Sequence, residues 1–431
     1  MTTGSLRRTL GLSDAVTIGL GSMIGAGVFA VWGPAAASAG GLVLVALLLA
    51  AVVAVCNALS SAALAARYPS AGGTYVYGRE RLGPFWGYLA GWCFVIGKTA
   101  SCAAMAMVVG SYLVPGASKV AAVAAVVLVT ALNLMGVQRS VSASRAIVAV
   151  VSCALLGVAV AAVWPRDDGG MRWDPGRLFG PVGEGAGSLA AQLPAVGVLQ
   201  AAGLIFFAFA GYARIATLGE EVREPERVIP RAVVLALSTV LVIYLVVGVI
   251  VLGVLGHEGA AGSAAPVAEA ASVVWGERWS WVIRVVAGLA ALGALLNLVL
   301  GISRTALAMA RDRHLPRPMA VVAGPHSVPR VAELVVGTAV LVAVLLADLR
   351  GAIGFSSFGV LLYYAVANAS AWTLREEWPL GRVVPVVGLV GCLVLAVTLP
   401  LGSVVGGGAL VLAGALVYLV RGRQGSGRPV G

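Results

Sequence analysis

Apolar residues in this chain form long unbroken runs, and most polar and charged residues lie between the runs. A run of about 20 apolar residues is long enough to cross the hydrocarbon layer of a membrane as a helix. The runs of this kind fall at residues 13–38, 41–66, 84–113, 119–137, 145–164, 196–219, 231–255, 280–309, 331–348, 352–374, 383–400 and 403–420. The pattern therefore predicts an all-α polytopic membrane protein with twelve transmembrane helices.

Composition agrees with this prediction. Of the 431 residues, 60% are hydrophobic and 11% are charged, whereas a soluble domain is about half apolar and about a quarter charged. The net charge of +11 does not indicate a nucleic-acid partner, because the basic residues lie in short clusters between apolar runs. The expected surroundings are a lipid bilayer.

The basic clusters also predict an orientation. Most Arg and Lys residues lie in the two termini and in alternate loops on the same side, and such residues concentrate on the cytoplasmic side of membrane proteins. We therefore expect a multi-pass protein of the plasma (inner) membrane with cytoplasmic N- and C-termini. The five cysteines lie in apolar runs and the three histidines lie far apart in loops, so neither a metal site nor a cofactor is expected.

Glycines interrupt the first apolar run, where residues 19–34 read GLGSMIGAGVFAVWGP. Irregular backbone at membrane depth survives only where it lines a cavity or packs against protein. Gly21, Gly25 and Gly27 would let the helix open near mid-membrane and expose amides that suit a carboxylate. Taken alone, Gly21 and Gly25 fit tight helix packing equally well.

A second interruption favours a transport site over simple helix packing. Residues 203–219, GLIFFAFAGYARIATLG, carry Ala210-Gly211 near the middle of the sixth run. Breaks in the first and sixth spans are typical of two inverted five-span repeats with substrate held between them. The chain is then one transport domain, with repeats at residues 13–164 and 196–374 and two further helices at residues 383–420.

Four motifs resemble the signature stretches of the amino acid–polyamine–organocation superfamily of permeases: GSMIGAGVF (21–29), RYPSAGGTYVYGRERLG (67–83), FFAFAGYARIATLGEEVREPERVIPRA (206–232) and GISRTALAMARDRHLP (301–316). The resemblance covers all twelve runs in order. It implies a leucine-transporter type of fold, with broken helices 1 and 6.

The resemblance also implies a substrate site. Amides around Ala26 and Gly27 would bind the substrate carboxylate, and the carbonyls of Met23, Phe207 and Ala210 would take its α-ammonium group. Phe207 also falls where the family often places an aromatic gate, although it could instead pack like its aromatic neighbours. The expected substrate-binding residues are Met23, Ile24, Gly25, Ala26, Gly27, Phe207, Ala208, Ala210 and Gly211.

Polar groups inside the apolar runs are candidates for proton coupling or substrate tuning. Lys98 lies near the middle of the third run, where burying a charge in the membrane costs roughly 3 kcal/mol. It could therefore gain and lose a proton during transport. Alternatively, its side chain snorkels to the membrane surface or is neutralised by backbone carbonyls at a helix break. Asn297 alone offers a side-chain oxygen in the middle of the eighth run, too few for a sodium site. The sequence therefore favours a proton over sodium as coupling ion.

Charges after the second break have two interpretations. Arg214 either faces the substrate or pairs with Glu220 or Glu221 in a cytoplasmic vestibule. The two glutamates are expected in an inner gate with cytoplasmic arginines, although a solvated helix end is the commoner role of such charges.

These observations predict a secondary active amino acid transporter, not an enzyme. A pocket bordered by Lys98 and Arg214, with no carboxylate in the middle of any span, favours neutral or acidic amino acids. We expect transport to be coupled to protons or to proceed by exchange. A cationic amino acid or polyamine antiporter is the alternative. An ion channel would need a filter loop or charged rings, and an intramembrane enzyme would need further catalytic groups. No obligatory partner chain is expected.

Overall fold

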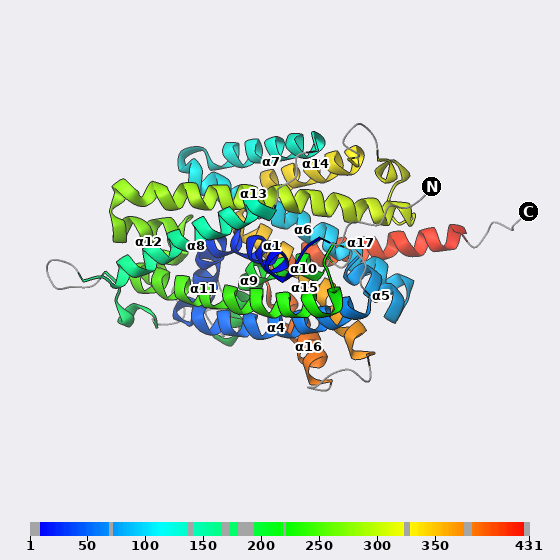
Figure 1. Cartoon of the computed structure of the whole chain (residues 1–431), viewed down its shortest axis with the longest axis horizontal. Helices are drawn as coiled ribbons and strands as arrows, with labels where there is room; N and C mark the ends of the chain where they lie inside the picture. The colour runs from blue at the N-terminus through cyan, green and yellow to red at the C-terminus, as the bar shows by residue number, and fades with distance from the viewer. Residues whose placement is uncertain are drawn as a thin grey trace, which may run out of the picture.

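The computed structural model is all helical over the part of the chain that it describes, which is residues 9–68, 72–136, 141–165, 172–179, 194–216, 218, 221–322, 328–374 and 382–425. Within these residues, ten helical stretches are long and apolar enough to cross a membrane. Most of the long helices run roughly along one direction and pack side by side as a bundle (Figure 1).

The helices are, in chain order, α1 (Leu12–Ile24), α2 (Gly27–Ala30), α3 (Trp32–Ala39), α4 (Val43–Arg67), α5 (Thr74–Leu82), α6 (Pro84–Leu113), α7 (Ser118–Leu134), α8 (Val141–Val163), α9 (Pro194–Phe209), α10 (Ala213–Ala216), α11 (Pro225–Gly262), α12 (Pro266–Trp275), α13 (Glu277–Arg311), α14 (Arg330–Leu346), α15 (Leu349–Trp372), α16 (Val383–Thr398) and α17 (Leu401–Gly425). Short 3₁₀ turns η3 (Pro175–Arg177), η4 (Ala210–Tyr212) and η5 (Arg317–Ala320) join some of them.

The apolar runs locate most of these helices. The third run, residues 84–113, coincides with α6, which begins at a proline in the first helical position, where its missing N–H is not needed. In the region of the ninth and eleventh runs, α14 and α16 have 17 and 16 residues, just short of the usual spanning length. The count of twelve spans therefore stays a prediction.

Glycine contacts bring α6 and α15 together at the centre of the bundle. A Cβ atom on Gly97 would lie 3.2 Å from Cα of Gly359, and one on Gly359 would lie 2.9 Å from the Cys93 carbonyl oxygen. Residues without a side chain allow such close backbone approach between membrane helices. The contact fixes the position of Lys98, the next residue on α6.

Backbone hydrogen bonds join the segment before α1 to the segment after α10. The Leu10 N–H donates to the Glu221 carbonyl at 3.1 Å, and the Arg223 N–H donates to the Leu10 carbonyl at 2.9 Å. This isolated parallel bridge between Leu10 and Val222 fixes the segment before the first apolar run to the segment after the sixth.

Candidate functional site

The first apolar run is interrupted at its glycines. Helix α1 ends at Ile24, Gly25 and Ala26 form a turn, and α2 begins at Gly27. A Cβ atom on Gly25 would lie 2.6 Å from the Ala294 Cβ of α13, so only glycine fits at this contact. Because the helix stops here, the last carbonyls of α1 lose their intrahelical partners.

The sixth run is interrupted at Ala210-Gly211, as its sequence predicts. Helix α9 ends at Phe209, η4 covers Ala210–Tyr212, and α10 adds one further turn. The tighter 3₁₀ turn changes the hydrogen-bond spacing from i+4 to i+3. Carbonyls at the end of α9 therefore become available to other partners.

The two breaks contact one another directly. A Cβ atom on Gly27 would lie 2.8 Å from both Cα and Cβ of Ala208, and one on Gly211 would lie 2.5 Å from the Ser22 carbonyl oxygen. Met23, at the end of α1, is fully buried. The fold thus brings together the first-run and sixth-run residues that the sequence assigns to substrate binding, at a contact that is closed to solvent. The buried ones are Met23, Ile24, Gly25, Ala26, Gly27, Phe207, Ala208 and Ala210, and Gly211 is partly buried.

A tyrosine on α11 bridges the two breaks. The Tyr244 hydroxyl oxygen lies 2.7 Å from the Met23 carbonyl oxygen and 3.0 Å from the Ala208 carbonyl oxygen. A hydroxyl has one proton to donate, so it serves one of these carbonyls at a time. Sequence reasoning missed Tyr244, because a single tyrosine in an apolar run has no local signature.

Lys98 reaches the second break from α6. Its ammonium group donates to the Ala210 carbonyl at 3.1 Å, and the Tyr364 hydroxyl of α15 lies 3.4 Å from the same oxygen. Only 6% of the Lys98 surface is exposed. Of the two structural alternatives, snorkelling is therefore wrong, and a backbone carbonyl at a helix break binds the lysine. That carbonyl is one expected to take the substrate α-ammonium group.

The remaining predicted residues lie around this contact. Arg214, on α10, interacts electrostatically with Glu221 and with Arg304 of α13. Glu221 is partly exposed in the turn after α10, whereas Glu220 lies outside the described residues. Asn297 is partly buried on α13, three residues beyond the alanine that contacts Gly25.

A polar cluster joins α5 to the end of α13, and sequence reasoning did not predict its contacts. The Tyr75 hydroxyl donates to the Asp312 carboxylate and lies 3.0 Å from His314 Nδ1, and Arg79 lies 3.5 Å from the same carboxylate. Burial, followed by the neighbouring Asp312 carboxylate, raises the pKa of the Tyr75 phenol. The cluster therefore holds a neutral tyrosine against an Arg–Asp pair.

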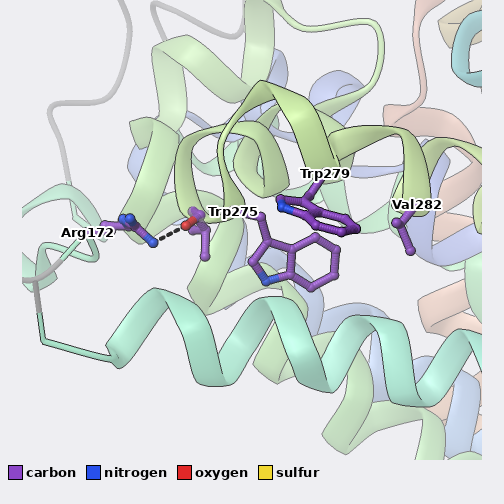
Figure 2. Close-up of a pocket in the computed structure, with 5 residues that line it drawn as sticks. Arg172, Trp275, Trp279 and Val282 are labelled. Atoms are coloured by element: carbon purple, nitrogen blue, oxygen red, sulfur yellow. Dashed lines mark hydrogen bonds between the residues drawn. The ribbon is translucent and has the colours of Figure 1, made fainter.

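In the part of the chain that the structure describes, no three His, Cys, Asp or Glu side chains form a group able to hold a metal ion. A pocket of about 500 Å³ is lined by Arg172, Val274, Trp275, Trp279 and Val282 (Figure 2). The Arg172 guanidinium donates to the Val274 carbonyl at its edge. Its lining includes no residue of either break, so it is separate from the candidate site.

Comparison with known proteins identifies the family. The family model described as "Amino acid permease" matches residues 10–419. An uncharacterized transporter of Mycobacterium tuberculosis strain H37Rv is 57% identical over 96% of this chain and 92% of its own length. The branched-chain amino acid permease BcaP of Bacillus subtilis is 26% identical over 98% and 94%, and the cationic amino acid transporter 4 of Mus musculus is 28% identical over 86% and 60%. The chain is a multi-pass membrane protein that belongs to the amino acid permease family, a family of transporters rather than enzymes.

Proposed function

We propose that this protein is a secondary active transporter that moves neutral or acidic amino acids across the plasma membrane by alternating access. The main observation in support of this proposal is the direct contact between the two helix breaks, where Tyr244 and Lys98 donate hydrogen bonds to backbone carbonyls. The proposal includes a single transport domain of twelve spans in two inverted repeats, with both termini in the cytoplasm. The opposed breaks, one in the first apolar run and one in the sixth, are the arrangement that such repeats produce.

The substrate amino acid would bind at the breaks through its two charged ends. The amides of Ala26 and Gly27 would receive the carboxylate, and the carbonyls of Met23, Phe207 and Ala210 would receive the α-ammonium group. The C-terminal ends of α1 and α9 carry the negative end of the helix dipole, which favours a cation there. The carbonyl at Ala210 already accepts a primary ammonium group, that of Lys98, which supports this assignment.

Substrate binding would then require Lys98 to leave Ala210, because both ammonium groups need the same oxygen. Loss of a proton from Lys98 would weaken its hold on the carbonyl, since a neutral amine donates a weaker hydrogen bond than an ammonium group. This exchange offers a route for proton coupling through Lys98, in place of a sodium ion. Exchange of one amino acid for another is the second possible mode.

Charge supports neutral or acidic substrates. The residues at the two breaks and their partners Lys98, Tyr244 and Tyr364 include no carboxylate, so a cationic side chain would meet Lys98 without compensation. The branched-chain specificity in the name of BcaP agrees with a neutral substrate. The cationic amino acid transporter among the relatives keeps a cationic amino acid or polyamine antiporter as the alternative.

Glu221 would form part of an inner gate, with Glu220 as its expected companion. The electrostatic contact of Glu221 with Arg214, and of Arg214 with Arg304, supports a charged network after the second break. In this arrangement Arg214 serves the gate rather than the substrate. Asn297 would tune the site from α13, close to the first break.

A thermal-shift screen of the purified full-length protein against all amino acids and common polyamines tests the proposal. We expect a neutral or acidic amino acid to raise the unfolding temperature and to drive saturable counterflow in proteoliposomes. A shift with arginine or putrescine alone would establish the alternative. Flux that neither saturates nor shows counterflow would instead indicate a channel.

A further inference from the structure

A buried carboxyl group lies far along the chain from both breaks. Glu333, in the first turn of α14, has no exposed surface. Helix α14 packs against α7 and α13, and Figure 1 shows the three lying together at one side of the bundle. The Ser303 hydroxyl of α13 donates to Glu333 Oε1 at 2.6 Å, whereas Oε2 has no hydrogen-bond partner among the described residues.

Other unsatisfied polar atoms surround this carboxyl. The Asn133 side chain of α7 lies beside it, and Asn133 Oδ1 is buried without a partner. Thr130, one turn earlier on α7, has a buried hydroxyl without a described partner, and a Cβ atom on Gly337 would lie 2.6 Å from it. Glu333 and Gly337 are one turn apart, so these groups form one polar cluster between α7, α13 and α14.

Charged neighbours do not neutralise Glu333 by direct contact. Arg304 on α13 acts on it electrostatically. Among the described residues no ion pair within 4 Å involves Glu333. The other charged residues of the adjoining elements are Lys98 on α6, Lys119 on α7, Glu277, Arg278, Arg284 and Arg311 on α13, Arg317 on η5 and Arg330 on α14.

A buried, unpaired carboxylate is costly, so this carboxyl needs either a proton or a bound cation. A metal cation requires several oxygen ligands and room for the ion, and neither described cavity reaches this cluster. A proton needs no extra room, and it gives the carboxyl an O–H donor for one of the unsatisfied neighbouring oxygens. The arrangement therefore favours a proton.

We propose that Glu333 is a proton-binding site of this transporter, protonated in the conformation described and deprotonated at another stage of the transport cycle. Helix α14, which carries Glu333, also packs against α6, which carries Lys98. A change of charge at Glu333 would therefore act on the helix that holds Lys98 at the Ala210 carbonyl. The inference rests on the proposed function, since it assumes a transport cycle driven by protons.

Glu333→Gln tests the proposal, because glutamine keeps the shape of a protonated carboxyl and cannot release a proton. Three measurements compare it with the wild-type protein: thermal shift with the amino acid that binds, counterflow without a pH gradient, and concentrative uptake driven by an inward proton gradient. Infrared difference spectra between the amino acid-bound and amino acid-free protein report the protonated carboxyl band. Glu269→Gln, an exposed glutamate in the first turn of α12, is the matched control.

We expect Glu333→Gln to retain amino acid binding and counterflow, to lose at least tenfold in gradient-driven accumulation, and to lose the carboxyl band. Glu269→Gln should match the wild-type protein throughout. Unchanged accumulation and an unchanged band in Glu333→Gln would overturn the site while leaving amino acid transport intact. If the wild-type protein binds no amino acid, that result would instead contradict the proposed function.

Two further measurements keep the test decisive. If Glu333→Gln does not fold, Ser303→Ala serves in its place, because loss of the hydroxyl at 2.6 Å should shift the frequency of the carboxyl band. A band that does not shift would refute the assignment to Glu333. Accumulation that follows a sodium gradient instead of a proton gradient, and that Glu333→Gln abolishes, would make the cluster a cation site and overturn the proton assignment.

Discussion

Replacing Gly27 with alanine changes the closest contact between the two helix breaks. The new Cβ atom would lie 2.8 Å from Cα and Cβ of Ala208 and 3.1 Å from the Tyr244 hydroxyl, where ordinary contact begins at 3.4 Å. The region is buried, so the breaks must separate to accept the methyl group. Overpacking of this kind costs about 1–3 kcal/mol.

This cost falls only on conformations in which the breaks touch. A bias of about 1–3 kcal/mol shifts a conformational equilibrium by about 5- to 150-fold. We therefore expect Gly27→Ala to lower the thermal unfolding temperature in detergent and to reduce counterflow in proteoliposomes by a factor in this range. Adding Ala208→Gly should restore part of the loss, because it removes one of the two clashing atoms.

Gly301→Ala is the matched control for this prediction. A Cβ atom on Gly301 meets nothing within 4 Å, and alanine is the better helix former by about 1 kcal/mol. Its unfolding temperature should equal or exceed that of the wild-type protein, with unchanged counterflow. Wild-type stability and counterflow in Gly27→Ala would refute the close contact between the breaks.

Three other substitutions each remove a side-chain hydrogen bond that the structure shows. Lys98→Met removes the ammonium group from the Ala210 carbonyl, so uptake should lose its pH dependence while a neutral amino acid still binds; pH-dependent uptake in the variant would contradict this role. Tyr244→Phe removes one buried hydrogen bond, worth about 0.5–1.5 kcal/mol, and should lower the unfolding temperature without changing substrate preference; an unchanged temperature would contradict the bridge. The Arg350 guanidinium of α15 lies 3.0 Å from the Gln200 side-chain amide oxygen of α9. Because Arg350→Gln removes this contact, backbone amide hydrogen exchange in α9 should become faster. Unchanged exchange would show that the contact does not restrain the helix.

Hydropathy predicts the spans well because lipid-facing and core-facing residues are both apolar in a membrane protein. It identifies α6 over its whole length and misses the ends of α11 and α13, which extend the predicted runs 231–255 and 280–309 with polar residues. Helix α5 was not predicted, because its TYVYGRERL sequence is polar and lies outside any apolar run. Such helices form through contacts that a hydropathy pattern does not record.

The breaks are predictable for a different reason. Gly25, Gly27 and Gly211 are needed where two backbones meet, so the glycines themselves locate the site. Tyr244 and Glu333 acquire their environments only when α11 packs on the breaks and α14 packs on α7 and α13. In the sequence, Glu333 is an ordinary charged residue near one end of an apolar run. Its complete burial results from the packing of α14 against α7 and α13.

The number of hydrogen-bond donors at the breaks explains why the site would prefer an amino acid to a carboxylic acid without an amino group. The carbonyls of Met23 and Ala208 share the single Tyr244 proton, and Ala210 relies on Lys98 at 3.1 Å with Tyr364 more distant at 3.4 Å. An α-ammonium group brings three donors and can serve carbonyls that Tyr244 cannot serve together. A carboxylic acid of the same shape without its amino group brings no such donors, so it lacks about 1.5–3 kcal/mol for each hydrogen bond that the ammonium group would make. Such an analogue should therefore compete at least fivefold less well than the amino acid in counterflow, and equal competition would show that the carbonyls at the breaks do not recognise the substrate.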